Sequence, residues 1–210
     1  MTEIPDFGDS RGPLRPRRAE EFDEFYEGTP PWDIGRPQPA FVGLAEAGAI
    51  TGRVLDVGCG TGEHALLAAG LGLEATGVDA APTAVARAEE KAKERGLEAR
   101  FLVADGLDLG SLGEQFDTVV DSGLFHVFED DDRARYVESL GRVVRPGGRY
   151  FMLCFSEHQP GDWGPRRVTQ AEIRASFAAG WRVDSIEVER LHVTFDTTGV
   201  AAWLAALSRE

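Results

Sequence analysis

The stretch Val54-Leu55-Asp56-Val57-Gly58-Cys59-Gly60-Thr61-Gly62-Glu63-His64 decides the fold of this chain of 210 residues. Its pattern predicts a short apolar strand, a loop with three alternating glycines and the start of a helix. Glycine permits positive φ and a close approach of the backbone to a ligand. A helix N-terminus offers unpaired N–H groups to a carboxylate or a phosphate. The order of these features favours a ligand-binding loop in an α/β fold over a plain turn.

The glycine spacing differs from that of a nicotinamide-binding fold, whose fingerprint is Gly-x-Gly-x-x-Gly. Here Gly62 comes one residue early, and Glu63 stands where the third glycine would be. Asp56, two residues before the first glycine, would repel a pyrophosphate. The loop therefore favours a ligand that carries an ammonium group as well as a carboxylate. An NAD-dependent oxidoreductase stays a more distant alternative.

Strand and helix patterns alternate on both sides of this loop. Further strands are expected at residues 74–78, 100–103, 116–120 and 149–155, and helices at 18–27, 40–48, 63–69, 82–95, 132–144 and from 169 on. Such alternation predicts a parallel sheet with helices on both faces. Residues 182–190 and 198–207 are expected to add an antiparallel hairpin with a turn near 196–199. The alanine-rich residues 200–207 have helix propensity, and only the expected topology favours a strand there.

Composition and charge narrow the class of protein. Apolar residues make up 42% and charged residues 28%, which is typical of a globular domain. The net charge is 22 minus 36, or −14, which disfavours nucleic acid as a partner. The longest run without charge or histidine is the 12 residues 197–208, too short to span a membrane. Because the chain has two cysteines and no visible secretory signal, we expect a cytoplasmic protein. The sequence does not determine the oligomeric state.

Acidic residues follow three more of the expected strands. Asp79 comes 21 residues after Gly58, where an acid can accept hydrogen bonds from both hydroxyls of a ribose. Asp105 can accept from an adenine amino group. Asp121 ends the fourth strand, beside the switch point at which open α/β sheets bind ligands. We expect these carboxylates to meet at one edge of the sheet.

With these motifs the chain resembles the class I S-adenosylmethionine-dependent methyltransferases from about Arg53 to the C-terminus. The resemblance implies a Rossmann-like, seven-stranded, mostly parallel sheet in the order 3-2-1-4-5-7-6, with strand 7 antiparallel. It also implies that S-adenosyl-L-methionine is the cofactor. The residues expected to bind it are Trp32, Asp56, Gly58, Cys59, Gly60, Asp79, Ala80, Asp105, Gly106 and Asp121.

The segment before residue 40 carries a second resemblance. Pro31-Trp32-Asp33-x-Gly35-x-Pro37-x-Pro39 is similar to the lid of the thiopurine, halide/thiol and tellurite-resistance methyltransferases. It also resembles small bacterial enzymes that act on benzoquinone- or phenol-like rings. We therefore expect residues 1–39 to form a flexible arm and lid, and residues 40–210 the methyltransferase domain. Phe25, Tyr26, Trp32 and Phe125 are expected to contact the acceptor, although Trp32 could instead anchor the arm in the core.

The expected reaction is methyl transfer to a small-molecule acceptor, with a phenol- or quinone-like ring favoured. A phenol, with a pKa of about 10, profits more from a base than a thiol, with a pKa of about 8.5. His126 is the candidate base, and a structural histidine beside the next helix is the alternative. Asp121-Ser122-Gly123-Leu124 lacks the two prolines typical of adenine- and glutamine-directed enzymes, which disfavours amino groups as acceptors. A thiol or halide acceptor and a non-catalytic cofactor-binding protein stay as alternatives, and no metal is expected.

Overall fold

The computed structural model describes residues 19–210; the expected flexible part of the arm before residue 19 lies outside these residues. Seven strands within 19–210 form one sheet in the order β3-β2-β1-β4-β5-β7-β6. The strands are β1 (Val54–Val57), β2 (Ala75–Asp79), β3 (Arg100–Val103), β4 (Phe116–Ser122), β5 (Val144–Phe155), β6 (Trp181–Val193) and β7 (Asp196–Arg209). The strands β1 to β5 pair in parallel, and β7 is antiparallel to both of its neighbours. The Rossmann-like order implied by the resemblance is confirmed.

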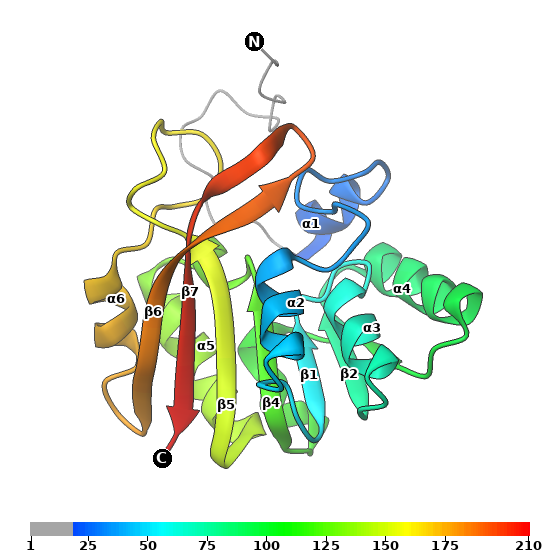
Figure 1. Cartoon of the computed structure of the whole chain (residues 1–210), viewed down its shortest axis with the longest axis horizontal. Coiled ribbons are helices and arrows are strands. Elements are labelled where there is room, and N and C mark those ends of the chain that lie inside the picture. Colours follow the sequence, from blue (N-terminus) through cyan, green and yellow to red (C-terminus); the bar gives the residue numbers. More distant parts are fainter. Residues whose placement is uncertain (1–18) are drawn as a thin grey trace.

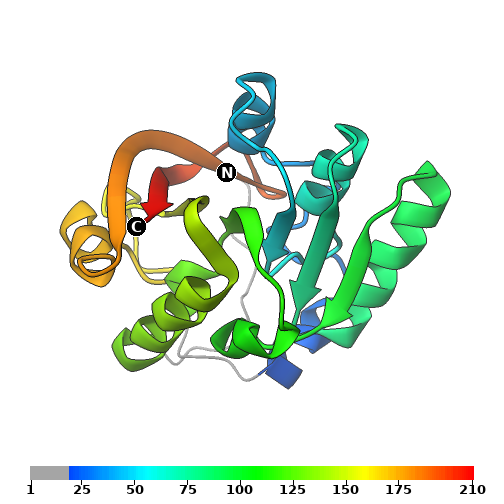
Figure 2. The same cartoon turned by 90° about the horizontal axis from the view of Figure 1, so that it is seen from below.

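Helices cover both faces of the sheet (Figures 1 and 2). They are α1 (Ala19–Phe25), α2 (Pro39–Glu46), α3 (Glu63–Gly70), α4 (Pro82–Arg95), α5 (Asp130–Val143) and α6 (Gln170–Ser176), with short 3-10 helices η1 (Gly106–Leu112) and η2 (Phe125–Val127). The helices α2, α3 and α4 pack against one face. The helices α5 and α6 and the segment η1 pack against the other. No helix among the described residues has the length and apolar character needed to cross a membrane.

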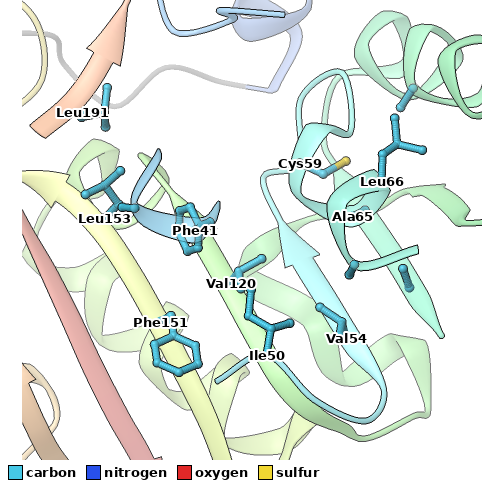
Figure 3. Packing of buried hydrophobic residues seen from close by; sticks show 14 of the residues in the cluster. Phe41, Ile50, Val54, Cys59, Ala65, Leu66, Val120, Phe151, Leu153 and Leu191 are labelled. Atoms are coloured by element: carbon cyan, nitrogen blue, oxygen red, sulfur yellow. The ribbon is translucent and has the colours of Figure 1, made fainter. Parts of the chain in front are cut away.

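Two apolar clusters separate the sheet from its helices because strand side chains alternate between the faces. In β5, Phe151 and Leu153 face one cluster, and Tyr150 and Met152 face the other. Figure 3 shows the first cluster, in which Phe41 of α2 packs with side chains of β4 and β5. Both faces of the central strands are therefore buried, which holds their carboxyl ends at one fixed edge.

The C-terminal hairpin forms as a pair of long strands, and its turn differs from the expectation. Val193 pairs with Asp196, so the turn consists of Thr194 and Phe195 rather than residues 196–199. The alanine-rich end of the chain is a strand despite its helix propensity. It pairs with β5 on one side and β6 on the other, and tertiary pairing of this kind overrides a weak local preference.

Candidate functional site

The glycine loop leaves β1 and leads into α3 as the sequence predicts. Gly58, Gly60 and Gly62 have φ values of +68°, +52° and +84°. The N–H groups of Gly58 and Cys59 donate to the carbonyl of Val78, which ties the loop to β2. A Cβ atom on Gly60 would lie 2.8 Å from the hydroxyl of Tyr26. Gly60 is therefore required both for its backbone conformation and for the close approach of Tyr26.

Asp56, at the end of β1, is a buried carboxylate with an unsatisfied oxygen. It is 1% exposed. Its Oδ2 accepts from the N–H of Ala65, at 3.0 Å, whereas Oδ1 has no hydrogen-bond partner. The nearest basic atom is Nδ1 of His64, at 3.8 Å. Burial raises the pKa of Asp56 to about 8, and the charges of Asp79 and Asp121 add to the effect. Such an orphaned acceptor fits a ligand that brings a cationic donor.

His64, in the first turn of α3, connects this carboxylate to the segment before residue 40. Its Nε2 accepts from the backbone N–H of Gln38 at 3.2 Å. Burial lowers the pKa of His64 to about 4, so the ring is neutral and Nδ1 carries its proton. That proton faces Asp56. The arrangement supports a positioning role for His64, as its place after the glycine loop suggests.

The two acids after β2 and β3 differ in how much of their hydrogen-bonding capacity the protein uses. Asp79 accepts from the N–H of Gly60 at 2.8 Å and from that of Ala81 at 2.9 Å, and burial raises its pKa. It therefore fastens the glycine loop as well as lining a cavity. Asp105 accepts from Leu107 N–H at 2.9 Å and is otherwise exposed. Both line the large cavity described below, together with Ala80 and Gly106.

Asp121 lies beneath the site and does not face it, contrary to the expectation of a cofactor contact. It is fully buried. Its Oδ2 accepts from the hydroxyls of Tyr136 and Tyr150, at 2.9 and 2.8 Å. Its Oδ1 accepts from the N–H of Leu124 at 2.8 Å. The carboxylate therefore fixes the turn after β4, and the neighbouring Ser122 lines the cavity instead.

Residues 19–39, which we call the lid, close over the carboxyl ends of the strands. Trp32 is surrounded by Phe22, Phe25 and Tyr26 in edge-to-face contacts with ring centroids 6.4, 5.3 and 6.3 Å away. Its Nε1 donates to the hydroxyl of Tyr26 at 3.0 Å. Phe25, Tyr26 and Trp32 also line the cavity. Trp32 therefore combines the two alternatives of the sequence analysis, since it both holds the lid together and borders the site.

Hydrogen bonds attach the lid to the domain at both ends. Asp23 accepts from the N–H of Thr83 at 2.8 Å and from its hydroxyl at 3.0 Å, and so caps α4. At the other end, the side chain of Gln38 bonds both backbone groups of His192 in β6, at 3.0 and 2.8 Å. Figure 1 shows the β6–β7 hairpin reaching toward the lid, where Thr194 N–H donates to the carbonyl of Pro31 at 2.9 Å. The described part of the lid is thus seated on the domain.

One cavity of about 570 Å³ lies between the lid and the strand ends. One end is bordered by Gly58, Asp79, Ala80, Asp105 and Gly106. The other end is bordered by apolar and aromatic side chains, namely Phe155, Trp163, Pro165, Leu191, Val193 and Phe195. A smaller cavity of about 50 Å³ adjoins the first and is lined by Cys59, Gly60, His64 and the lid residue Arg36, among others.

His126 and Phe125 follow β4 but have different surroundings. His126 lines the large cavity, and its Nδ1 accepts from the N–H of Phe155 at 3.0 Å. Burial, with Arg133 and Arg167 nearby, lowers the pKa of His126 to about 3. Phe125 is fully buried and stacks on Phe177, with ring centroids 5.8 Å apart. The expected contact of Phe125 with the acceptor is therefore wrong, because its ring faces α6.

The aromatic wall of the cavity escaped the sequence analysis. Its residues come from the segment after β5 and from the β6–β7 hairpin, and no local motif marks them. Arg36 and Gln38 were missed as well, although both lie in the quoted lid motif, which was the available signal. Among the described residues, no group of three or more His, Cys, Asp and Glu side chains is arranged to hold a metal ion.

Comparisons with known proteins agree with this geometry. Residues 54–148 match a family model described as a methyltransferase domain. A 2-heptyl-1-hydroxyquinolin-4(1H)-one methyltransferase of Mycobacteroides abscessus is 41% identical over 170 residues, which cover 80% of this chain and 75% of that protein. The probable thiol methyltransferase 2 of Arabidopsis thaliana is 29% identical over 147 residues, covering 69% of this chain and 65% of that protein.

A solved structure is similar over nearly the whole length. It comes from work on the conversion of a disulfide bond into a thioacetal group during echinomycin biosynthesis. The two chains are 42% identical and superpose with a TM-score of 0.84, over 92% of this chain and 93% of that one.

Proposed function

This chain belongs to the class I S-adenosylmethionine-dependent methyltransferases, and we propose that its acceptor is an oxygen on a small aromatic ring. S-adenosylmethionine is the cofactor, and the acceptor is a small molecule. The proposal concerns the class of that molecule and the atom that receives the methyl group.

The residues at the polar end of the cavity fit this cofactor. The orphaned Oδ1 of Asp56 offers an acceptor to an ammonium group from beneath the glycine loop, and Arg36 and His64 line the small cavity. Asp79 and Asp105 offer acceptors to ribose hydroxyls and an adenine amino group. We propose these roles for them, with Gly58 and Gly60 giving the backbone room to approach. When bound, the cofactor supplies a methyl group already activated by a sulfonium, whose carbon–sulfur bond breaks with both electrons left on sulfur.

The observation that carries the proposal is the single cavity with two unlike ends. The acids lie at one end, and the rings of Phe155, Trp163 and Phe195 lie at the other. Trp163 stands edge-on to both other rings, with centroids 5.9 and 5.4 Å away. Flat apolar walls of this kind suit an aromatic ligand. The lid excludes water, and alignment of two bound reactants can lower the barrier by about 7–11 kcal/mol.

The names of the relatives suggest two candidate acceptor atoms, oxygen and sulfur. The mycobacterial relative is named for a hydroxyquinolinone, which is a ring compound with an oxygen nucleophile. The plant relative is named for thiols, and the echinomycin work concerns sulfur. Sulfur is therefore the second candidate. The aromatic wall favours a ring compound, and the mycobacterial relative is the one named for such a compound.

An acceptor panel tests the proposal. We expect turnover with hydroxylated aromatic rings and N-hydroxy heterocycles, measured as S-adenosylhomocysteine formed and as methylated product by mass. Thiols and halides of matched size form the second half of the panel. The Asp56→Asn variant is the control for cofactor-dependent turnover. Methylation of thiols or halides alone, with every ring hydroxyl inert, would reject the ring-oxygen acceptor.

A further inference from the structure

The protonation of His126 is fixed by its surroundings. Its Nδ1 accepts a hydrogen bond from the backbone N–H of Phe155 at 3.0 Å. A backbone N–H can only donate, so Nδ1 holds a lone pair. In a neutral imidazole the proton is then on Nε2. The sequence analysis assigns this residue the role of a base, but the lone pair that a base needs is already engaged.

Nε2 of His126 lies beside Gly123 at the cavity wall, and it is not among the buried side-chain atoms without a partner in the described residues. A Cβ atom on Gly123 would lie 3.4 Å from Nε2 and 3.5 Å from Cε1 of His126, and both residues line the large cavity. The ring stands edge-on to Phe155, with centroids 5.0 Å apart. His126 therefore presents an N–H donor within the aromatic wall.

The charges around His126 oppose a second proton on its ring. The side chain of Arg133, in α5, is 4% exposed, and its guanidinium lies 4.6 Å from the Phe125 ring centroid. Arg167 follows β5 and lies 5.2 Å from the ring centroid of Phe155. Both arginines and the burial lower the pKa of His126.

Carboxylates also lie near these cations: Glu172 and Asp130 act on Arg133, and Asp162 acts on Arg167. Glu172 is 3.5 Å from Arg133 but also pairs with Arg166. Asp132 borders the cavity and pairs with Arg135. Within residues 19–210, no carboxylate lies within ion-pairing distance of Arg167, whose N–H groups donate to carbonyls such as those of Trp163 and Gly161.

We propose that His126 donates its Nε2–H to an acceptor oxygen that arrives already ionised. The substrate class is then a small ring compound with an acidic hydroxyl, such as one on a ring nitrogen or beside an electron-withdrawing group. The inference rests on the proposed function and names the substrate class for the same site.

The charge balance of the reaction agrees with this role. The hydroxyl proton is lost to water before the acceptor binds. The anionic oxygen then forms the new bond to the methyl carbon, the sulfonium becomes a neutral thioether, and an uncharged methyl ether results. His126 keeps its proton throughout. A hydrogen bond from N–H to an anionic oxygen is among the stronger ones, so it selects the ionised acceptor and orients it.

Nitrogen NMR of the wild-type protein with labelled histidine tests the tautomer without any turnover. We expect the His126 Nε2 signal of a protonated nitrogen and the Nδ1 signal of an unprotonated one, unchanged between about pH 5 and 9. His64 serves as the internal reference, because its Nε2 accepts from Gln38 and the opposite tautomer is expected. A proton on Nδ1 of His126, or titration near neutral pH, would overturn the inference.

Two substitutions separate a donor from a base. His126→Gln keeps an N–H donor and cannot act as a base, whereas His126→Leu keeps neither property. With a nitrophenol as acceptor, the donor role predicts that the Gln variant stays within about tenfold of wild type in kcat/KM. The Leu variant should fall about tenfold to a hundredfold, the effect of one hydrogen bond to a charged group. Equal large losses in both folded variants would support the base and reject the donor.

The pH profile gives an independent readout. At saturating S-adenosylmethionine, which removes the pH dependence of cofactor binding at Asp56, kcat/KM for each acceptor should rise with pH up to the pKa of that acceptor, with no break from His126 near neutral pH. His158→Asn is the matched histidine control, since that side chain packs on Trp203 outside the cavity. If no ring hydroxyl is methylated at all, the proposed function fails. If ring hydroxyls are methylated with one shared enzyme pKa, only the inference about His126 fails.

Discussion

The two ends of the cavity are built in different ways. The cofactor end is polar and is formed by the strand ends of β1, β2 and β3, where Asp56, Asp79 and Asp105 follow one another along the chain. The acceptor end is apolar and combines the lid, the segment after β5 and the β6–β7 hairpin. The first end offers backbone groups and carboxylates, and the second offers ring faces and the N–H of His126.

Under the proposed function, this difference separates cofactor recognition from acceptor recognition. A glycine loop between a strand and a helix has little freedom to vary, because its backbone must approach both Tyr26 and the cofactor. The aromatic wall lies on loops and on a hairpin turn, where side chains can change without disturbing the sheet. Substitutions at one end should therefore leave binding at the other end intact, and the following predictions test that separation.

The largest effect is expected from removing the lid. Deletion of residues 1–38 takes away Trp32, Tyr26 and the Gln38 contacts to His192. We expect a folded core with weak cofactor binding and turnover reduced by a factor of about 10³ or more, since alignment and water exclusion are both lost. Thermal unfolding checks the fold, and S-adenosylhomocysteine formation measures turnover. A truncated protein with full turnover would show that the lid is not needed.

The next largest effect is expected at Asp56. Asp56→Asn should weaken S-adenosylmethionine binding by about tenfold to a hundredfold, the range for a hydrogen bond to a charged group. Because the pKa of Asp56 is about 8 in the free protein, binding of an ammonium group should release a proton near pH 7. Affinity should therefore rise between about pH 6 and 8 in wild type.

Calorimetry in buffers of different ionisation enthalpy measures the released proton directly. The Asp56→Asn variant should release none, and its affinity should be flat over the same range. Equal proton release in both proteins would place the titrating group elsewhere. Acceptor KM should change little, in keeping with the separation of the two ends.

Gly60→Ala should disturb the contact between the glycine loop and the lid. Its φ of +52° is unfavourable for alanine, and the new Cβ would lie 2.8 Å from the Tyr26 hydroxyl. We expect a loss of about 1–3 kcal/mol in the free energy of unfolding. Gly72→Ala is the matched control, since Gly72 also has a positive φ, +76°, but no atom within 4 Å of such a Cβ.

The double variant Gly60→Ala/Tyr26→Phe separates the contact from the backbone strain. Removal of the hydroxyl relieves the contact, so part of the lost stability should return. Equal losses in the Gly60 and Gly72 variants, measured by urea denaturation, would mean that the lid contact contributes nothing.

A smaller effect is expected at the acceptor wall. Phe195 lies in the hairpin turn, with its ring centroid 5.4 Å from that of Trp163. Phe195→Ala should raise acceptor KM by about tenfold, the value of one aromatic contact of about 1 kcal/mol or slightly more, and leave S-adenosylhomocysteine affinity unchanged. Val188→Ala is the control, because Val188 lies on β6 of the same hairpin and is 74% exposed. Weaker cofactor binding in Phe195→Ala would break the separation of the two ends.

The smallest effect is a pH dependence of stability. The pKa of Asp56 is about 8 in the folded state, well above its value in the unfolded chain. Between these two values only the folded state keeps the carboxyl proton, so the free energy of unfolding falls as pH rises toward about 8. The Asp56→Asn variant has no carboxyl proton to lose, so its stability should not fall for this reason. The free energy of unfolding of the variant minus that of wild type should therefore increase with pH, by at most about 1.4 kcal/mol per pH unit between pH 6 and 8. A constant difference across this range would contradict the raised pKa.

The sequence predicted the residues that line the polar end of the cavity because they sit in local motifs. A glycine that must adopt positive φ, and an acid directly after an apolar strand, can be recognised from a few neighbouring residues. The same reasoning failed for Asp121 and Phe125. Both follow β4 directly, yet the strand turns Asp121 toward Tyr136 and Tyr150, and Phe125 packs against Phe177. The surroundings of these two side chains depend on residues that are distant in the sequence.

Through its resemblance to a known family, the sequence by itself determined the order of the strands in the sheet. It also determined which glycines and acids follow which strand. Only the tertiary structure decided which of these groups meet at the cavity, because the aromatic wall unites segments that are far apart in the chain. It also decided the chemistry of His126. One backbone N–H, that of Phe155, occupies its Nδ1 and leaves a donor facing the cavity, and no local pattern around His126 contains that contact.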